Sequence, residues 1–362
     1  MYDYALIIHP TSEESLYTYE PGLKNKPRPL IKKLVEWSSP FTAAEINGLN
    51  SHLGRTAKGA LIMCPLLPEH IMTFPLKKVI KSVVETIEFT EKALSPKLIG
   101  LTAYIAFSSI KSLGLAKVTS TPLTTGANYT LAMIPESILR AVDFMGMDLS
   151  QSYVLVVGAT SNVGRYCIEI LSYFVPGMFI TAHNEDSLGI LLSELPKEKR
   201  SKLHTSNDIS SILDKVNIVI IATNRIPQGI DVNRFNPGTV VFDASYPRRI
   251  PARLRDDILV IDGVAIKPPG NVNFNFDFGL PAGLCYPCMA ETIVLALEKK
   301  YENYSFGKEF NAAKIKQILR LGAKHGFEIS GLTSQEKAIT NKEISEIKNN
   351  SRKKRSKLLA WR

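Results

Sequence analysis

The segment Tyr153-Val-Leu-Val-Val-Gly-Ala-Thr-Ser-Asn-Val-Gly164 joins a short apolar run to a loop with a glycine at each end. The apolar run is rich in β-branched residues, which is typical of a buried strand. Residues 165–174 then predict a helix with apolar side chains for packing. A strand, a glycine-containing loop and a helix in this order favour phosphate binding, because the helix N-terminus offers N–H groups and a positive dipole end to a pyrophosphate.

The apolar runs that follow predict a sheet. They are residues 178–182, 217–223, 239–243 and 258–262, and helical sequence follows the first of them. Continuous apolar strands that alternate with helices indicate a parallel sheet covered on both faces. We therefore predict an α/β protein in which residues 150–266 form a doubly wound parallel, Rossmann-like sheet that binds NADP.

Other segments surround this sheet in the predicted domain organisation. Short apolar runs and several prolines in residues 1–125 predict an N-terminal α+β substrate domain. Residues 126–149 predict a connecting helix, and residues 267–335 predict a C-terminal loop and helices that carry a cysteine. Residues 336–362 are rich in basic side chains and predict a disordered tail.

The composition excludes several classes of protein. The chain has 362 residues, of which 45% are hydrophobic and 22% charged, and this argues against a fibrous or largely disordered chain. No apolar run approaches the roughly 18 residues of a membrane-spanning helix. Four cysteines are too few for a disulfide framework in a chain of this length. We expect a reduced, cytoplasmic protein.

The net charge of +10 is distributed unevenly along the chain. Residues 341–362 hold eight basic and two acidic residues, so +6 of the total lies there. Because the rest of the chain carries only +4, we predict no nucleic-acid partner. The tail has three interpretations: a solvated end, attachment to an acidic partner, or contact with an anionic membrane surface, which Leu358, Leu359 and Trp361 would support.

Ten residues are predicted to bind the cofactor, and no metal site is predicted. Gly158 would permit the tight turn, Gly164 would let the helix pack closely, and Ser161 stands where a further glycine is usual. The set comprises Gly158, Thr160, Ser161, Asn162, Val163 and Gly164 in the loop, His183 and Asn184 after the second strand, and Ala222 and Thr223 in the third.

The end of the second strand bears on the identity of the cofactor. NAD sites usually place Asp or Glu there to bond the ribose 2′-hydroxyl. Here the tip reads Thr181-Ala-His-Asn184, and Glu185 comes later. A tip without a carboxylate tolerates a 2′-phosphate, so the sequence favours NADPH.

Cys285-Tyr-Pro-Cys288 begins a segment that predicts a helix, because Pro287 suits a first helical position and apolar residues follow at helical spacing. Cys288 would lie in the first turn, where N–H groups and the helix dipole stabilise a thiolate. A thiolate in a nicotinamide enzyme suggests covalent thioester chemistry. A buried inert cysteine, a zinc site and a redox dithiol formed with Cys285 are the alternatives.

Ten short motifs occur in an order and spacing that resemble one known family. They are Glu36-Trp-Ser-Ser-Pro40, Leu67-Pro-Glu69, Thr124-Thr-Gly126, Val156-Val-Gly-Ala-Thr160, Thr181-Ala-His-Asn184, Pro227-Gln-Gly229, Tyr246-Pro247, Cys288-Met-Ala-Glu291, Asn303-Tyr-Ser-Phe-Gly307 and His325-Gly-Phe327. Together they resemble the cyanobacterial long-chain acyl-[acyl-carrier-protein] reductases, over nearly the whole chain to about residue 330.

This resemblance implies NADPH-dependent reduction of a long-chain fatty acyl thioester to a fatty aldehyde. It implies that Cys288 is the nucleophile and that the acyl group arrives on acyl carrier protein or coenzyme A. An oxyanion stabiliser is required, and the backbone of Thr125 and Gly126 is the candidate because we expect the helix start there to face the interdomain cleft. The family usually has arginine where His183 stands, and the basic tail also departs from it.

Two other functions fit the same residues. An NADP-dependent hydroxy-acid or keto-acid dehydrogenase with a shikimate-dehydrogenase-like layout would not need Cys288. A non-catalytic NADP-binding scaffold would hold a partner through the basic tail. Incubation with an acyl thioester in the absence of NADPH separates the three, since only the thioester reductase should gain an acyl group.

Overall fold

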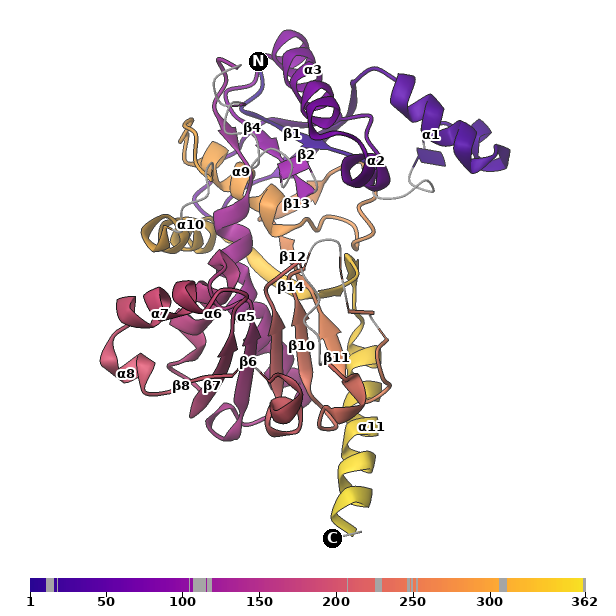
Figure 1. Ribbon diagram of the computed structural model, residues 1–362. Helices are drawn as coiled ribbons and strands as arrows, with labels where there is room; N and C mark the ends of the chain where they lie inside the picture. The colour runs from indigo at the N-terminus through magenta and orange to yellow at the C-terminus, as the bar shows by residue number, and fades with distance from the viewer. Residues whose placement is uncertain are drawn as a thin grey trace. The chain divides into compact units, whose positions relative to one another are not determined.

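The computed structural model in Figure 1 describes residues 1–10, 16, 17, 19–103, 105, 106, 115, 119–206, 208–224, 230–245, 248, 250, 251, 253–305 and 311–360. Three of the family-like motifs fall wholly or partly outside these residues, at 227–229, 246–247 and 306–307. The chain forms two compact units. Unit 1 comprises Met1–Thr130 and Ala265–Ser330, and unit 2 comprises Leu131–Val264 and Gly331–Arg362.

Unit 2 contains a six-stranded parallel sheet. Its strands are β6 (Tyr153–Val157), β7 (Gly177–Thr181), β8 (Leu203–Thr205), β9 (Ile218–Ile221), β10 (Val240–Asp243) and β11 (Leu259–Ile261). They are arranged in the order β11-β10-β9-β6-β7-β8, and every pairing is parallel. Counted from β6, this is the order 3-2-1-4-5-6 of dinucleotide-binding Rossmann folds. The predicted α/β fold class is confirmed.

The helices of unit 2 connect and cover these strands. They are α6 (Asn162–Leu171), α7 (Glu185–Glu194), α8 (Lys197–Arg200), α11 (Asn341–Ala360) and the later part of α5 (Ala127–Met145). The described residues of the unit also form the short 3₁₀ helices η4 (Leu149–Gln151), η5 (Ser210–Lys215) and η6 (Val232–Arg234). One face of the sheet buries Leu155, Val219 and Val241 against apolar residues of η5.

The structure corrects the expectation of a disordered tail, because Asn341–Ala360 form α11. One side of this basic helix has partners on unit 2. Lys354 Nζ lies 3.0 Å from an oxygen of the buried Asp257, and Lys348 Nζ donates to the Phe144 carbonyl at 2.8 Å. The Phe144 carbonyl belongs to the last turn of α5, where the helix dipole favours a cation. These acceptors are remote in sequence from the tail, so the basic run alone did not reveal them.

Replacing Lys354 with alanine is expected to destabilise unit 2. Burial tends to raise the pKa of the Asp257 carboxyl, but its bonds to Arg255 and Lys354 hold that pKa below the usual range. Loss of the partly exposed Lys354 should lower the free energy of unfolding by about 1–2 kcal/mol. Lys353→Ala removes an exposed cation from the same helix and serves as the control in thermal unfolding. Equal melting temperatures for the two variants would show that the Lys354 contact contributes nothing.

Unit 1 is built on a mixed sheet. Its strands are β1 (Tyr4–Ile8), β2 (Phe41–Leu49), β3 (Gly59–Met63), β4 (Ile99–Leu101), β5 (Leu123–Thr124) and β13 (Gly270–Asn273), in the order β13-β2-β3-β1-β4-β5. β1, β3, β4 and β5 run parallel to one another. β2 pairs antiparallel with β3, and β13 pairs antiparallel with β2. A small sheet of β12 (Gly263–Lys267), β14 (Glu328–Ser334) and β15 (Lys337–Ala338) includes residues of both units.

Helices cover both faces of the unit 1 sheet. The helices of unit 1, of which η2 and α1 lie away from the sheet, are η2 (Pro21–Asn25), α1 (Arg28–Trp37), α2 (Pro68–Thr73), α3 (Leu76–Leu94), the start of α5, α9 (Pro287–Leu297) and α10 (Ala312–His325). Successive strand residues point to opposite faces. Ile7 and Leu101 therefore pack with α3, whereas a Cβ on Gly100 would lie only 2.1 Å from Thr292 Oγ1 of α9. This close approach fixes α9 on the face opposite α3.

Two observations concern membrane contact. Among the helices of the described residues, none is long and apolar enough to cross a lipid bilayer. Trp361 and the side chains of Leu358 and Leu359 lie outside what the structure describes, so it adds nothing about their part in the predicted membrane contact of the tail.

Candidate functional site

The predicted cofactor residues lie at the carboxyl edge of the unit 2 sheet. β6 pairs with β7 on one side and with β9 on the other, so the chain changes winding direction beside β6. In open parallel sheets this switch point forms the crevice that binds dinucleotides. The loop 158–164 follows β6, residues 183–184 follow β7, and residues 222–223 follow β9, which collects all ten predicted residues at this edge.

Two glycines shape the loop after β6. Gly158 has φ of +88°, and a Cβ on it would lie 2.6 Å from the Ala222 carbonyl oxygen. A Cβ on Gly164 would lie 2.4 Å from the Gly158 carbonyl oxygen. The first glycine therefore lets the turn pass against the end of β9, and the second lets α6 pack on the turn. The loop has the close backbone packing that a pyrophosphate site requires, and it fits a nicotinamide dinucleotide.

Polar side chains cap the helices at this edge. The Ser161 hydroxyl accepts a hydrogen bond from the Gly164 N–H at 3.0 Å and is the N-cap of α6. Asn184 accepts from the Ser187 N–H at 2.9 Å and caps α7. Ser161 therefore replaces the usual glycine with a residue that fixes the helix start. His183, beside Asn184, is exposed.

Cys288 stands at the start of α9 in unit 1, one residue after Pro287. It is partly exposed, whereas each other residue of this eleven-residue helix is buried. Cys285 is fully buried, and its backbone exchanges hydrogen bonds with Ile266. All four cysteines are free thiols, and within the described residues no three His, Cys, Asp or Glu side chains gather as a metal site would need. Accessibility therefore favours Cys288 over Cys285 as the reactive thiol.

Gly126 lies directly against Cys288. It follows β5 with φ of +71°, a conformation that favours glycine. A Cβ on Gly126 would lie 2.3 Å from the Cα atom of Cys288 and 2.5 Å from its Cβ atom. The structure thus brings together Gly126 and Cys288, which are far apart in sequence, in a contact that leaves no room for a side chain.

The sequence singled out the backbone of Thr125 and Gly126 as the oxyanion stabiliser, but the structure places other groups beside the Cys288 sulfur. The Gly126 N–H donates to Thr124 Oγ1 at 3.4 Å, and the buried Thr125 hydroxyl donates to the Ser305 carbonyl. The Ala103 N–H bonds the Cys288 sulfur, and the Met289 N–H, which also interacts with this sulfur, donates to the Tyr286 carbonyl at 3.0 Å. Met289 is in the first turn of α9, and Ala103 follows β4 with φ of +47°.

Glu291 lies one helical turn after Cys288 and is fully buried. Its carboxylate accepts hydrogen bonds from the Tyr129 N–H at 2.8 Å and from the Thr124 hydroxyl. The N–H of Asn128 also bonds to it. Burial raises the pKa of Glu291, and these donors oppose that effect. Because Asn128 and Tyr129 are in the first turn of α5, Glu291 caps α5 and ties its start to α9.

The Cys288 thiol is less acidic than the helix-dipole argument predicts. Burial raises the pKa of Cys288 to about 11, although hydrogen bonds from the Ala103 and Met289 N–H groups act in the opposite direction. The Glu291 carboxylate raises the pKa further. Desolvation therefore outweighs the helix N-terminus, and the free protein holds a neutral thiol at pH 7.

The pH dependence of thiol alkylation tests this protonation state. Because the thiolate is the reactive form, the rate of Cys288 modification by iodoacetamide should rise by about tenfold per pH unit from pH 7 to 10. A Cys288→Ala chain gives the background from the other cysteines, which are buried. A rate that levels off below pH 8 would show that the N–H donors stabilise the thiolate after all.

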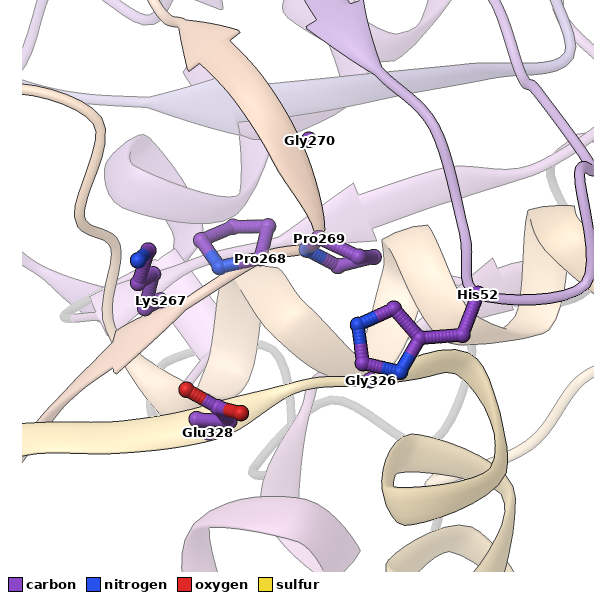
Figure 2. Close-up of a pocket in the computed structure, with 7 residues that line it drawn as sticks. All are labelled: His52, Lys267, Pro268, Pro269, Gly270, Gly326 and Glu328. Atoms are coloured by element: carbon purple, nitrogen blue, oxygen red, sulfur yellow. The ribbon is translucent and has the colours of Figure 1, made fainter.

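A separate cavity lies elsewhere in unit 1. Figure 2 shows it between His52, the Lys267–Gly270 segment, Gly326 and Glu328, and its volume is about 140 Å³. Ligand sites are usually at least about 300 Å³. None of its lining residues is a predicted site residue. The His52 ring lies over Gly326, where a Cβ would come within 2.5 Å of it, so we interpret the cavity as a packing feature at the end of α10.

No family model matches the chain. It is 26% identical over 312 residues to aminotransferase PigE of Serratia sp., covering 83% of this chain and 36% of that protein. It is 25% identical over 310 residues to the long-chain acyl-[acyl-carrier-protein] reductase of Synechococcus elongatus, covering 81% of this chain and 89% of that protein. The chain thus spans about a third of the length of PigE and most of the length of the reductase.

Solved structures with some likeness to the chain include two dehydrogenases. Shikimate dehydrogenase from Aquifex aeolicus is 12% identical, with a TM-score of 0.36 over 88% of this chain and 97% of that one. An L-alanine dehydrogenase is 12% identical, with a TM-score of 0.35 over 70% and 75% of the two chains. The sequence matches support a distant relationship, and the Rossmann fold of unit 2 rests on its own strand order.

Proposed function

We propose that this protein is an oxidoreductase that reduces a long-chain fatty acyl thioester to a fatty aldehyde with NADPH, through a thioester on Cys288. The observation that carries the proposal is the partly exposed Cys288 at the start of an otherwise buried helix, with backbone N–H groups directed at its sulfur. The glycine loop of a Rossmann sheet in the same chain supports a nicotinamide cofactor. The match to a named acyl-[acyl-carrier-protein] reductase supports the substrate class.

In the proposed reaction, Cys288 Sγ attacks the carbonyl carbon of the acyl thioester. The bond to the carrier sulfur breaks, and the proton of Cys288 leaves with the carrier thiol. The Ala103 N–H group stabilises the oxyanion of the tetrahedral intermediate, because it already bonds the sulfur beside it. NADPH, when bound, supplies the hydride that reduces the thioester carbon. The resulting thiohemiacetal oxyanion then collapses to the aldehyde and the Cys288 thiolate, which takes a proton from water to restore the free thiol.

We assign the remaining residues to binding and positioning. Gly158, Ser161 and Gly164 shape the loop that holds the pyrophosphate, and Glu291 holds the start of α9 in register with the turn at Gly126. The acyl carrier is acyl carrier protein or coenzyme A. Turnover of a long-chain acyl-CoA tests the proposal: one aldehyde should form per NADPH consumed. Oxidation of a hydroxy acid with NADP that survives loss of Cys288 would favour the dehydrogenase alternative.

Carboxylates beside the β7 tip should limit the preference for NADPH. Residues 181–184 carry no acid, but Glu185 and Asp186 occupy the first turn of α7 and are exposed. Their charges repel a 2′-phosphate at that tip. The double variant Glu185→Gln, Asp186→Asn should raise kcat/KM for NADPH by about two- to fivefold and leave the value for NADH unchanged. Glu198→Gln, an exposed acid in the first turn of α8, is the control. An equal gain for NADH would contradict this reasoning.

A further inference from the structure

Residues 21–37 of unit 1 form a basic segment with exposed apolar side chains. The segment contains η2 and α1, and it holds five basic residues and one acidic residue. Lys24, Lys26 and Lys33 are exposed. Figure 1 draws α1 (indigo) at the outer side of α2, away from the sheet of unit 1. The segment is thus a peripheral part of its own unit with a concentrated positive charge.

The packing of α1 fixes which of its sides faces outward. Ile31 and Val35 are buried and form the inner face. Lys32 Nζ lies 2.6 Å from a carboxylate oxygen of Glu69 on α2, and Lys78 of α3 pairs with Glu36. These two ion pairs join α1 to both neighbouring helices. With α1 held in this way, the side of the helix opposite Ile31 and Val35 faces away from the protein.

Apolar side chains lie on that outward side. Leu30 and Trp37 are seven residues apart and share one face of α1. Leu30 is 40% exposed and Trp37 is 73% exposed. Lys33 is at the next position along this face. A helix with Trp and Leu on one side, flanked by lysines, has the composition of helices that lie in the interface of a lipid bilayer.

We propose that the outward face of α1, together with η2, binds the surface of an anionic lipid bilayer. Lysines at 24, 26 and 33 complement the negative charge of the headgroups, and Trp37 favours the headgroup region, where its amphipathic ring is accommodated. An acidic soluble partner would satisfy the lysines but would not explain a tryptophan this exposed. The basic cations of α11 are a weaker candidate, since Lys348 and Lys354 already bind groups of unit 2. The proposal goes beyond the proposed function and does not depend on it.

Co-sedimentation of the full chain with vesicles tests the proposal without substrate or cofactor. The chain should bind vesicles of phosphatidylglycerol and phosphatidylcholine at low salt and should not bind phosphatidylcholine alone. Because each cation near such a surface contributes about fivefold in binding, Lys24→Gln with Lys33→Gln should weaken binding by roughly thirtyfold. Trp37→Ser should weaken it as well. Tyr173→Ser, which removes a 70% exposed aromatic ring from unit 2, should not.

Tryptophan quenching distinguishes α1 from the tail. The chain has two tryptophans, so Trp361→Phe leaves Trp37 as the single reporter and Trp37→Phe leaves Trp361. Brominated lipids should quench Trp37 and not Trp361. Three results would overturn the proposal: quenching of Trp361 alone, vesicle binding that Trp37→Ser does not change, and the absence of any vesicle binding. So would a Trp37→Ser variant that instead loses self-association or binding to soluble acyl carrier protein. Turnover on soluble acyl-CoA is measured in a separate assay. The proposed function can therefore fail while membrane binding is confirmed, and membrane binding can fail while the proposed function is confirmed.

Discussion

We expect the Cys288→Ala variant to form no aldehyde from a long-chain acyl thioester and still to bind NADPH. This is the expected result because the thiol is on α9 of unit 1 and the glycine loop is between β6 and α6 of unit 2. Removal of a nucleophile that forms a covalent intermediate should lower kcat by about 10⁴-fold or more. The measurement pairs aldehyde quantification with the fluorescence of bound NADPH.

Cys285→Ala is the matched control for this experiment. Cys285 is fully buried, and its backbone bonds to Ile266 do not depend on its side chain. Burial holds the pKa of the Cys285 thiol well above its usual value, so it is not a nucleophile at neutral pH. We expect turnover close to that of the unmodified chain, with some loss of stability from the deleted sulfur. An inactive Cys285→Ala chain beside an active Cys288→Ala chain would overturn the assignment.

Gly126→Ala should also slow the reaction strongly. The new methyl group would lie 2.3 Å from the Cα atom of Cys288, so either the turn at Thr124–Gly126 or the start of α9 must move. Overpacking of this kind costs about 1–3 kcal/mol. Displacement of the nucleophile from its N–H donors should lower the rate of Cys288 acylation by about 100-fold. The rate is read from the burst of carrier thiol released.

Gly54→Ala separates steric overlap from backbone strain. Gly54 also has a left-handed φ, +69°, but no atom lies within 4 Å of the position that a methyl group would take there. Both variants therefore share the backbone cost of about 1 kcal/mol, and only Gly126→Ala meets Cys288. If Gly54→Ala slows acylation as much as Gly126→Ala does, the contact with Cys288 is not the cause.

The Rossmann sheet could be predicted from the sequence because its strands are continuous apolar runs. Strands such as Ile218–Ile221 are buried on both faces, which removes polar residues from them. The loop between Gly158 and Gly164 could be predicted for a related reason. A Cβ atom at either position would lie 2.4–2.6 Å from a backbone carbonyl oxygen, so only glycine fits there.

Other features depend on partners that are distant in the chain. The order of α11 comes from groups such as Asp257 and the Phe144 carbonyl, which the basic run does not reveal. The raised pKa of Cys288 comes from the desolvation of its thiol in the folded chain. The contact of Ala103 with the Cys288 sulfur is made by a backbone N–H, so the identity of its side chain could not indicate this role in the sequence. Glu291 could have been identified from the sequence, because an acidic residue in the apolar run 289–297 requires a buried hydrogen-bond partner.

Intact-mass measurement of the acyl-enzyme decides whether Cys288 acts covalently. The full chain is incubated with a long-chain acyl-CoA in the absence of NADPH, and its mass is recorded before and after hydroxylamine treatment. We predict one added acyl group, located on Cys288 by peptide mapping, which hydroxylamine removes and NADPH converts to aldehyde. A chain that reduces the thioester without ever gaining this mass, or that carries the acyl group on another residue, would contradict a covalent role for Cys288.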